Sequence, residues 1–274
     1  LLFFYRDGES GNGRLVMNSY STKTGKWTRV QENLIDGEGK RSAYTQIAVG
    51  RNGLIHMSWV WRETPDVASN HDICYARSFD GGRTWTKSTG EPYRLPITSD
   101  NAEIAWKVPQ NSELINQTSM AVDNSGRPSV ATYWRDADSP VPQYRVVYLR
   151  DGRWRMSQVS DRKTPFSLSG GGTKRIPISR PQIAVDGRRV YVIFRDEERG
   201  NRPSVAVAEA IERGWRIVDL ADNDLGMWEP SFDLNLWNRK KILDLFVQRV
   251  GQGDGERLED LEPQMISILE WRPR

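Results

Sequence analysis

The clearest local structural signal in this 274-residue chain is Ser78-Phe79-Asp80-Gly81-Gly82-Arg83-Thr84-Trp85. The Asp side chain in such a segment can accept hydrogen bonds from the backbone N–H groups that follow it, and the glycines can adopt the positive φ of a tight reversal. The closing Trp is large enough to pack between two sheets. The stretch therefore predicts a tight turn between two strands, anchored in the core by its last residue.

Imperfect copies of this turn recur along the chain. A Gly-x-Trp or Gly-Trp signal ends at Trp27, Trp154 and Trp215, and a weaker one ends at Trp271. One complete copy in register with several imperfect ones indicates an internal repeat. We expect Trp27, Trp85, Trp154 and Trp215 to occupy equivalent positions on successive units.

The repeat unit is longer than the turn and recurs with a period of roughly 60 residues. It begins with a polar-then-apolar strand, found at 45–49, 118–122, 181–185 and 230–234. After a turn, a second strand rich in aromatic and β-branched residues follows at 56–62, 129–135, 190–195 and 242–248. A variable loop and a third strand then lead to the Trp signal, so each unit holds four strands.

Repeated four-stranded units predict an all-β fold, a β-propeller of four-stranded blades. About five units are visible in a single domain over residues 1–274, and the first lacks its opening strand. Because open sheet edges invite aggregation, we expect a longer parent with six or seven blades. Helix beyond a turn or two should be absent. An unrelated β-sandwich with Trp-bearing hairpins is the alternative.

Composition narrows the class of protein. The formal net charge of +3 is too small to suggest nucleic-acid coating, and no apolar stretch approaches membrane-spanning length. Cys74, the only cysteine, excludes an internal disulfide and a Cys-based zinc site. Most of the cations are Arg, whose guanidinium grips carboxylates bidentately, so their positions matter more than the net charge.

Propeller topology sorts candidate residues onto two faces. The second strands should end on one face, which places Arg62, Arg135 and Arg195 together, and the turn at Asp80 should lie on the opposite face. The starts of the third strands add His71 and Tyr144 to the Arg face. The loops that lead into the first strands add Gln117, Arg180, Trp228 and Glu229. The alternative for any single Arg is a structural pair with an acidic neighbour.

A histidine within a predicted strand, a glycine-rich run and an acidic loop each have a structural explanation besides a functional one. His56 lies inside a second strand, where the alternating pattern favours a packed position. The Gly-rich run 167–174 lacks phosphate-loop spacing, and a loop that lets backbone approach a ligand, or a flap, fits it better. The acidic loop 251–256 could hold Ca²⁺ but lacks EF-hand spacing, so a plain acidic turn is favoured and no cofactor is required by the sequence.

With Ser78–Trp85, the segments 49–56, 114–117 and 179–183 complete a resemblance to the bacterial BNR/Asp-box repeat proteins, over nearly the whole chain. This group is similar to propeller polysaccharide lyases, including ulvan lyases, and more distantly to sialidases. The resemblance implies an acidic oligo- or polysaccharide as partner and a secreted or periplasmic location. It also implies β-elimination at a uronic acid, with His71 as base, Tyr144 as acid, and Arg62, Arg135 and Arg195 holding the carboxylate.

Two other functions stay open at this point. An exo-glycosidase of sialidase or rhamnosidase type would use an Arg cluster, a Tyr nucleophile and a Glu. The candidates are Arg180 and Arg195 for the cluster, and Glu198 or Glu229 for the Glu. A non-catalytic glycan-binding propeller would keep stacking aromatics such as Trp228 and would not need His71.

Overall fold

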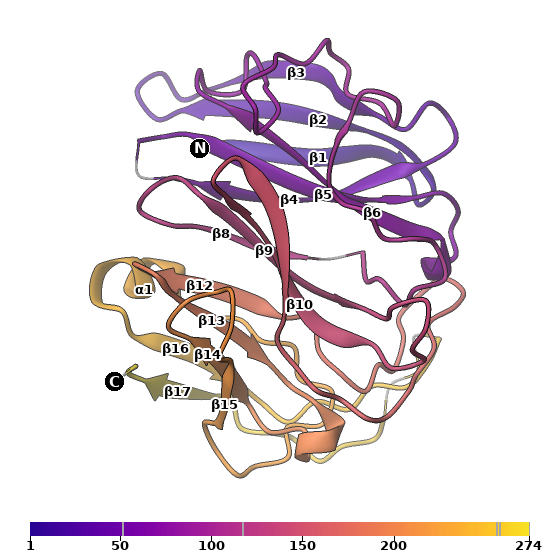
Figure 1. The fold of residues 1–274 in the computed structure, drawn as a ribbon, viewed down its shortest axis with the longest axis vertical. Helices are drawn as coiled ribbons and strands as arrows, with labels where there is room; N and C mark the ends of the chain where they lie inside the picture. The colour runs from indigo at the N-terminus through magenta and orange to yellow at the C-terminus, as the bar shows by residue number, and fades with distance from the viewer. Residues whose placement is uncertain (51, 117, 256, 258, 274) are drawn as a thin grey trace.

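In the computed structural model, which describes residues 1–50, 52–116, 118–255, 257 and 259–273, antiparallel sheets follow one another along the chain (Figure 1). Their strands, each hydrogen-bonded to the next in its sheet, are β1 (Leu2–Glu9), β2 (Asn12–Ser21) and β3 (Lys26–Asp36); β4 (Ser42–Val49), β5 (Ile55–Arg62), β6 (Asn70–Ser78) and β7 (Glu103–Trp106); β8 (Ser119–Val122), β9 (Pro128–Trp134), β10 (Gln143–Arg150) and β11 (Arg153–Gln158); β12 (Gln182–Asp186), β13 (Arg189–Phe194), β14 (Ser204–Ala208) and β15 (Arg216–Asp219); and β16 (Leu243–Val247) and β17 (Ser267–Trp271). The predicted all-β propeller architecture is confirmed, with five blades described.

Helical structure is short in the described residues. It consists of two 3-10 turns, η1 (Val67–Ser69) and η2 (Glu197–Arg199), and the helix α1 (Leu234–Lys240). None of these elements is long enough to cross a membrane. The predicted strand at 230–234 is wrong in part: only Phe232 bridges to Leu245, and α1 begins at Leu234. The Asp233 carboxylate caps α1 by accepting from two backbone N–H groups, which favours helix over strand there.

The four Trp residues predicted to be equivalent do not all start the same strand of their blades. Trp27 and Trp154 are the second residues of β3 and β11, Trp215 directly precedes β15, and Trp85 directly precedes Thr86, which bridges to Arg77 beside β6. Trp27, Trp154 and Trp215 therefore stand at the start of the outermost strand of their sheets, whereas Trp85 precedes an isolated bridge and the outermost strand of its sheet, β7, begins at Glu103. Trp271 differs, because it ends β17 and pairs with Leu243 in β16.

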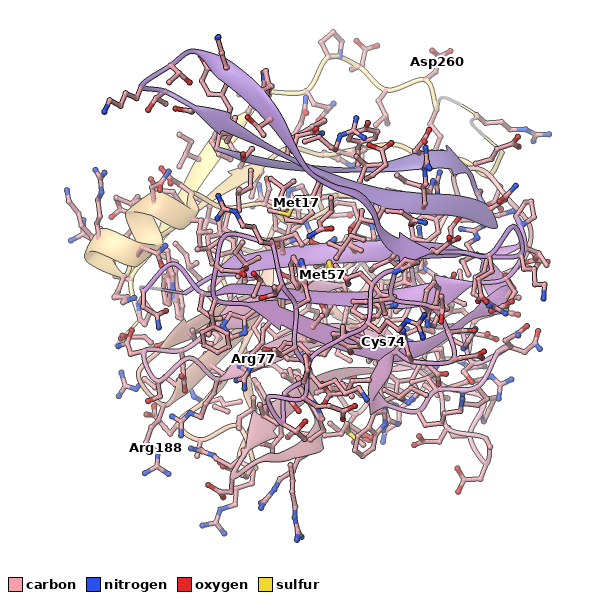
Figure 2. All side chains as sticks on the ribbon, turned by 90° about the horizontal axis from the view of Figure 1, so that it is seen from above. Met17, Met57, Cys74, Arg77, Arg188 and Asp260 are labelled. Carbon is pink, nitrogen blue, oxygen red and sulfur yellow. The ribbon has the colours of Figure 1, made fainter. Side chains whose placement is uncertain are left out.

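The apolar core lies between successive sheets. One cluster joins the first two sheets through Met17, Met57 and Trp85, and further clusters join the second to the third, the third to the fourth, and the fourth to the fifth. Met17 and Met57 lie in this interior when the stack is seen from above (Figure 2). Each blade is thus held by burial of apolar side chains against its neighbours.

The turn at Asp80 forms the predicted hydrogen bonds. Asp80 Oδ1 accepts the backbone N–H groups of Arg83 and Thr84 at 3.0 and 2.9 Å, and its Oδ2 accepts the Thr84 hydroxyl at 2.7 Å. Gly82 has φ of 90°, and a Cβ there would collide with the thioether of Met17. Trp85 is buried, and its indole N–H donates to the Gly82 carbonyl.

Candidate functional site

A cavity of about 210 Å³ opens at the end of the channel where the second strands of the blades end. Polar side chains that line it come from four blades and their connections. They are Arg62, Asn116, Thr173, Lys174, Arg180, Glu229 and Gln252, and apolar side chains including Val67, Ile115, Leu168 and Met227 complete the wall.

The repeat explains why these residues meet. Arg62 is the last residue of β5, whereas Asn116, Arg180 and Glu229 each lie just before the innermost segment of a successive blade. Because all blades are oriented alike around the channel, equivalent positions arrive at one mouth. The predicted separation of faces is confirmed, since His71 stands at the start of β6 and Asp80 follows its other end.

Glu229 and Arg180 form the central contact of the cavity. Glu229 Oε2 accepts the backbone N–H of Arg180 at 2.9 Å and its Nε–H at 3.2 Å. Burial raises the pKa of Glu229, and the nearby Arg180 charge only partly opposes the shift. A carboxyl group with a raised pKa in a polar cavity is suited to proton transfer.

Arg62 is fixed at the opposite wall. Its Nε–H donates to the Thr64 carbonyl at 3.1 Å, a second N–H group donates to the Pro65 carbonyl, and its guanidinium lies 5.6 Å from the centre of the Tyr44 ring. With its side chain nearly buried yet bordering the cavity, Arg62 presents a preorganised positive charge there.

His71 lies outside the lining of this cavity, in a neighbouring charge cluster. Its Nδ1 is 3.0 Å from Asp72 Oδ2 and its Nε2 is 2.8 Å from Glu63 Oε1. Burial lowers the pKa of His71, but the hydrogen bonds to the two carboxylates outweigh it and the net direction is upward. An imidazolium held on both nitrogens is poorly suited to accept a proton, so the geometry does not support the predicted role of base.

Tyr144 and Arg195 are buried between blades, and here the structure corrects the sequence-based prediction. The Tyr144 hydroxyl lies 2.8 and 2.9 Å from the carbonyl oxygens of Ser179 and Arg195, and burial raises its pKa well above the usual value. Arg195 is fully buried and donates to the carbonyl groups of Ile176, Pro177 and Trp228. Neither side chain lines the cavity. Arg195 instead holds the backbone that leads to Glu229.

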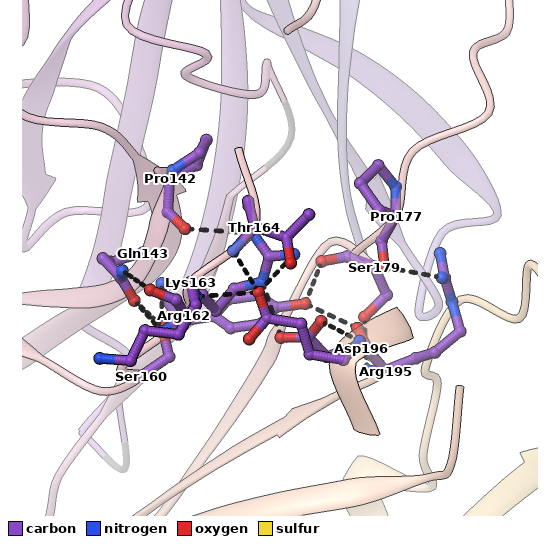
Figure 3. A network of polar contacts seen from close by, with 12 residues as sticks. Pro142, Gln143, Ser160, Arg162, Lys163, Thr164, Pro177, Ser179, Arg195 and Asp196 are labelled. Carbon is purple, nitrogen blue, oxygen red and sulfur yellow. Dashed lines mark hydrogen bonds and ion pairs between the residues drawn. The ribbon is translucent and has the colours of Figure 1, made fainter. Parts of the chain in front are cut away.

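Figure 3 shows the polar network that fixes this junction between the third and fourth blades. Arg162 Nε–H donates to Asp196 Oδ2 at 2.8 Å, and both side chains are almost completely buried. Burial raises the pKa of Asp196 even though Arg162 opposes the shift. Breaking such a buried pair costs about 3–5 kcal/mol, so the network is a structural joint.

The remaining predicted residues lie elsewhere. Arg135 borders a separate, shallow depression with Phe166, and it is 3.5 Å from Glu113 Oε1 and hydrogen-bonded to the Asn111 carbonyl. Trp228 is buried, with its indole N–H on the Phe246 carbonyl, so it offers no stacking surface. Gln117 lies outside the described residues.

Several cavity residues were not among the predicted site residues. Asn116 and Lys174 belong to loops that were predicted to reach this face. The glycine pattern at 167–174 and 251–255 was the signal for the loops that bring Thr173 and Gln252 to the cavity. In the described part of the chain, no group of three or more His, Cys, Asp or Glu side chains is placed to hold a metal ion. Asp254 accepts a backbone N–H of Arg175 instead.

This chain is similar to solved structures of carbohydrate-active enzymes and to one protein family. Among solved structures, an ulvan lyase of polysaccharide lyase family PL25, bound to -[GlcA(1-4)Rha3S]-, shares 15% identity over 79% of this chain with a TM-score of 0.60. A GH43 β-1,3-galactosidase shares 14% identity over 92% of this chain and 51% of its own length, with a TM-score of 0.45. This chain covers 52% of the ulvan lyase, about half its length, and no curated protein matches. The match to the ulvan lyase supports the fold. The model of the BNR repeat-containing family matches residues 1–162, more than half of the sequence, and the chain therefore belongs to that family.

Proposed function

We propose that this chain carries the substrate site of a carbohydrate-active propeller that cleaves an acidic polysaccharide at a uronic acid by β-elimination. The observation that carries the proposal is the grouping of Arg62, Lys174 and Arg180 around one carboxyl group, Glu229, in a single cavity. Three cationic side chains suit a sugar carboxylate, and a carboxyl with a raised pKa suits proton transfer.

The chemistry assigns a role to each group. The proton on C5 of the uronate is too weakly acidic to leave unless the adjacent carboxylate is neutralised, which Arg62 and Arg180 would do. The ionised Glu229 carboxylate takes the C5 proton, and the electron pair forms the C4–C5 double bond as the C4–O bond breaks. The Lys174 ammonium group supplies the proton to the leaving oxygen.

The number of carboxyl groups in the cavity favours elimination over hydrolysis. A glycosidase of the common type needs two carboxyl groups flanking the scissile bond. Glu229 is the one carboxyl group among the described residues that line the cavity. A sialidase-type nucleophile is disfavoured as well, because no tyrosine is among the described residues that line the cavity.

The resemblance to secreted polysaccharide enzymes supports a secreted or periplasmic location, since a polysaccharide substrate lies outside the cell. The likeness to the ulvan lyase supports ulvan as the first candidate substrate to test.

A panel of uronate-containing polysaccharides tests the proposal. Elimination yields an unsaturated uronate with ultraviolet absorbance, so we expect absorbance to rise together with new reducing ends. New reducing ends without that absorbance would favour a glycoside hydrolase. Saturable binding without new ends would favour the glycan-binding alternative, and both of these results contradict the proposed reaction.

A further inference from the structure

The segment Gly170–Arg175, here called the strap, connects the third and fourth blades but is held by loops of two others. At one end, Gly170 donates its N–H to Asp66 Oδ1 at 2.7 Å and accepts the N–H of Val67 at 2.9 Å. Towards the other end, Arg175 donates its N–H to Asp254 Oδ1 at 2.7 Å. Gly255 also donates to the Thr173 carbonyl at 3.0 Å.

These contacts carry the strap across the mouth of the channel. Asp66 belongs to the loop after β5 in the second blade, whereas Asp254 belongs to the loop after β16 in the fifth. Between the two anchor points, Gly172, Thr173 and Lys174 line the cavity that holds Glu229. The strap is therefore one wall of the candidate site and bridges blades that are not neighbours.

Glycine is required in the strap for conformational reasons. Gly170 and Gly172 have φ of 76° and 72°, which side chains other than glycine rarely adopt. The glycine run thus permits a tight path across the mouth, and two aspartates from distant parts of the sequence fix that path.

The cavity under the strap is distinct from a second cavity in the channel. A second cavity at the opposite end of the channel, lined by the ends of β4, β8 and β12 together with α1, shares no lining residue with the first. The volume of about 210 Å³ falls below the roughly 300–1,000 Å³ of common ligand pockets. Such a space suits one sugar unit better than a stretch of polymer.

We propose that the strap makes this site a blind pocket, which receives the terminal sugar of an acidic chain and excludes internal sugars. The inference rests on the proposed acidic-sugar site and adds the part of the polymer that it recognises. The Asp254 side chain is exposed, and it holds the strap through a single hydrogen bond from the Arg175 backbone N–H. The anchor at Asp254 is therefore the place where the strap can be released by a single substitution.

Size fractions of glucuronan, a polymer of glucuronate, test the inference without requiring turnover. The number of protein molecules bound per chain is measured by calorimetry against chain length, with sodium glucuronate as the single-sugar probe. End recognition predicts about one protein per chain at every length. A number that grows with chain length overturns the blind pocket but leaves an acidic-sugar site in place. Absence of binding to sodium glucuronate and to every fraction contradicts both proposals.

Asp254→Ala and Asp123→Ala form a matched pair for the strap itself. Asp123 also accepts backbone N–H groups in a turn, those of Ser125 and Arg127, but lies at the opposite mouth of the channel. We expect Asp254→Ala to speed hydrogen exchange in the strap and to let the number bound per chain rise with length, while Asp123→Ala behaves as the unmodified protein. Faster strap exchange with unchanged end binding would show that the strap does not close the site.

Discussion

Glu229 and Arg180 are 49 positions apart, yet one carboxylate oxygen of Glu229 accepts both the backbone and the side-chain N–H of Arg180. Each residue precedes the innermost segment of its blade, so the contact joins the fourth and fifth blades at the mouth of the channel. The ion pair leaves Glu229 with a raised pKa because burial outweighs the positive charge. The pair is therefore suited to hold a carboxylate and exchange a proton in the same cavity.

Glu229→Gln should abolish most of the proposed reaction. The amide keeps the shape and an acceptor for the Arg180 N–H but cannot take a proton, so we expect kcat to fall by about 10²- to 10⁴-fold with KM little changed. Initial rates of the ultraviolet assay measure the effect, and an unchanged melting temperature is the control. Full activity in this variant would remove Glu229 as the base.

The pH dependence should follow Glu229. A base must be ionised, so the rate rises as pH increases through the Glu229 pKa, which lies above the ordinary value of 4.5. Arg180 lowers that pKa, and Arg180→Gln should therefore move the acid limb of the kcat/KM profile to higher pH. If the acid limb of the kcat/KM profile lies at the same pH in Arg180→Gln as in the unmodified protein, a group other than Glu229 controls the rate.

His71 offers a direct contrast. Because both ring nitrogens contact carboxylates outside the cavity, we expect His71→Ala to cost about 1.5–3 kcal/mol of stability through lost hydrogen bonds to charged groups. Glu63 keeps its ion pair with Arg41, and Asp72 keeps its ion pair with Lys107. Turnover should fall far less than in Glu229→Gln. Urea unfolding and initial rates of the two variants separate these effects, and loss of turnover without loss of stability would restore the role predicted from sequence.

Local chemistry and repetition were enough to predict the blades. The turn at Asp80 and the Trp positions depend on residues close in sequence, so their structure could be predicted from a short stretch. The strand order of a propeller blade then correctly placed His71 and Asp80 at opposite ends of β6.

Side-chain roles were harder to predict because they depend on distant partners. Arg62 and Arg195 occupy similar positions at strand ends, yet only Arg62 borders the cavity. The Arg195 guanidinium instead donates hydrogen bonds to the backbone carbonyl groups of three other residues. The residues next to Arg195 in the sequence do not indicate which carbonyl groups it will contact. The path of the strap could not be predicted from the sequence either, because its anchors Asp66 and Asp254 lie far from it along the chain.

The turn at Asp80 should contribute to stability and leave the sugar site unaffected. Asp80→Ala removes the acceptor for two backbone N–H groups and the Thr84 hydroxyl on the face opposite the cavity. We expect a loss of about 1–2 kcal/mol, similar to loss of a helix cap. Urea unfolding measures the loss, and sodium glucuronate affinity should stay the same. A changed affinity would contradict the separation of the two faces.

His56 should make the protein sensitive to acid. It is fully buried, its Nδ1 is 2.7 Å from the Tyr75 hydroxyl, and burial, aided by the Arg77 charge, lowers its pKa to about 4. The unfolded chain binds a proton near pH 6.5, so between that pH and about pH 4 the unfolded state holds more protons and stability falls as pH decreases. The gap between the two pKa values corresponds to about 3 kcal/mol at most. In His56→Gln, which keeps a polar partner for Tyr75, the free energy of unfolding should change less over this pH range. Urea unfolding of both proteins at matched pH values gives the unfolding free energy as a function of pH. If this free energy falls equally steeply with pH in both proteins, groups other than His56 cause the loss of stability.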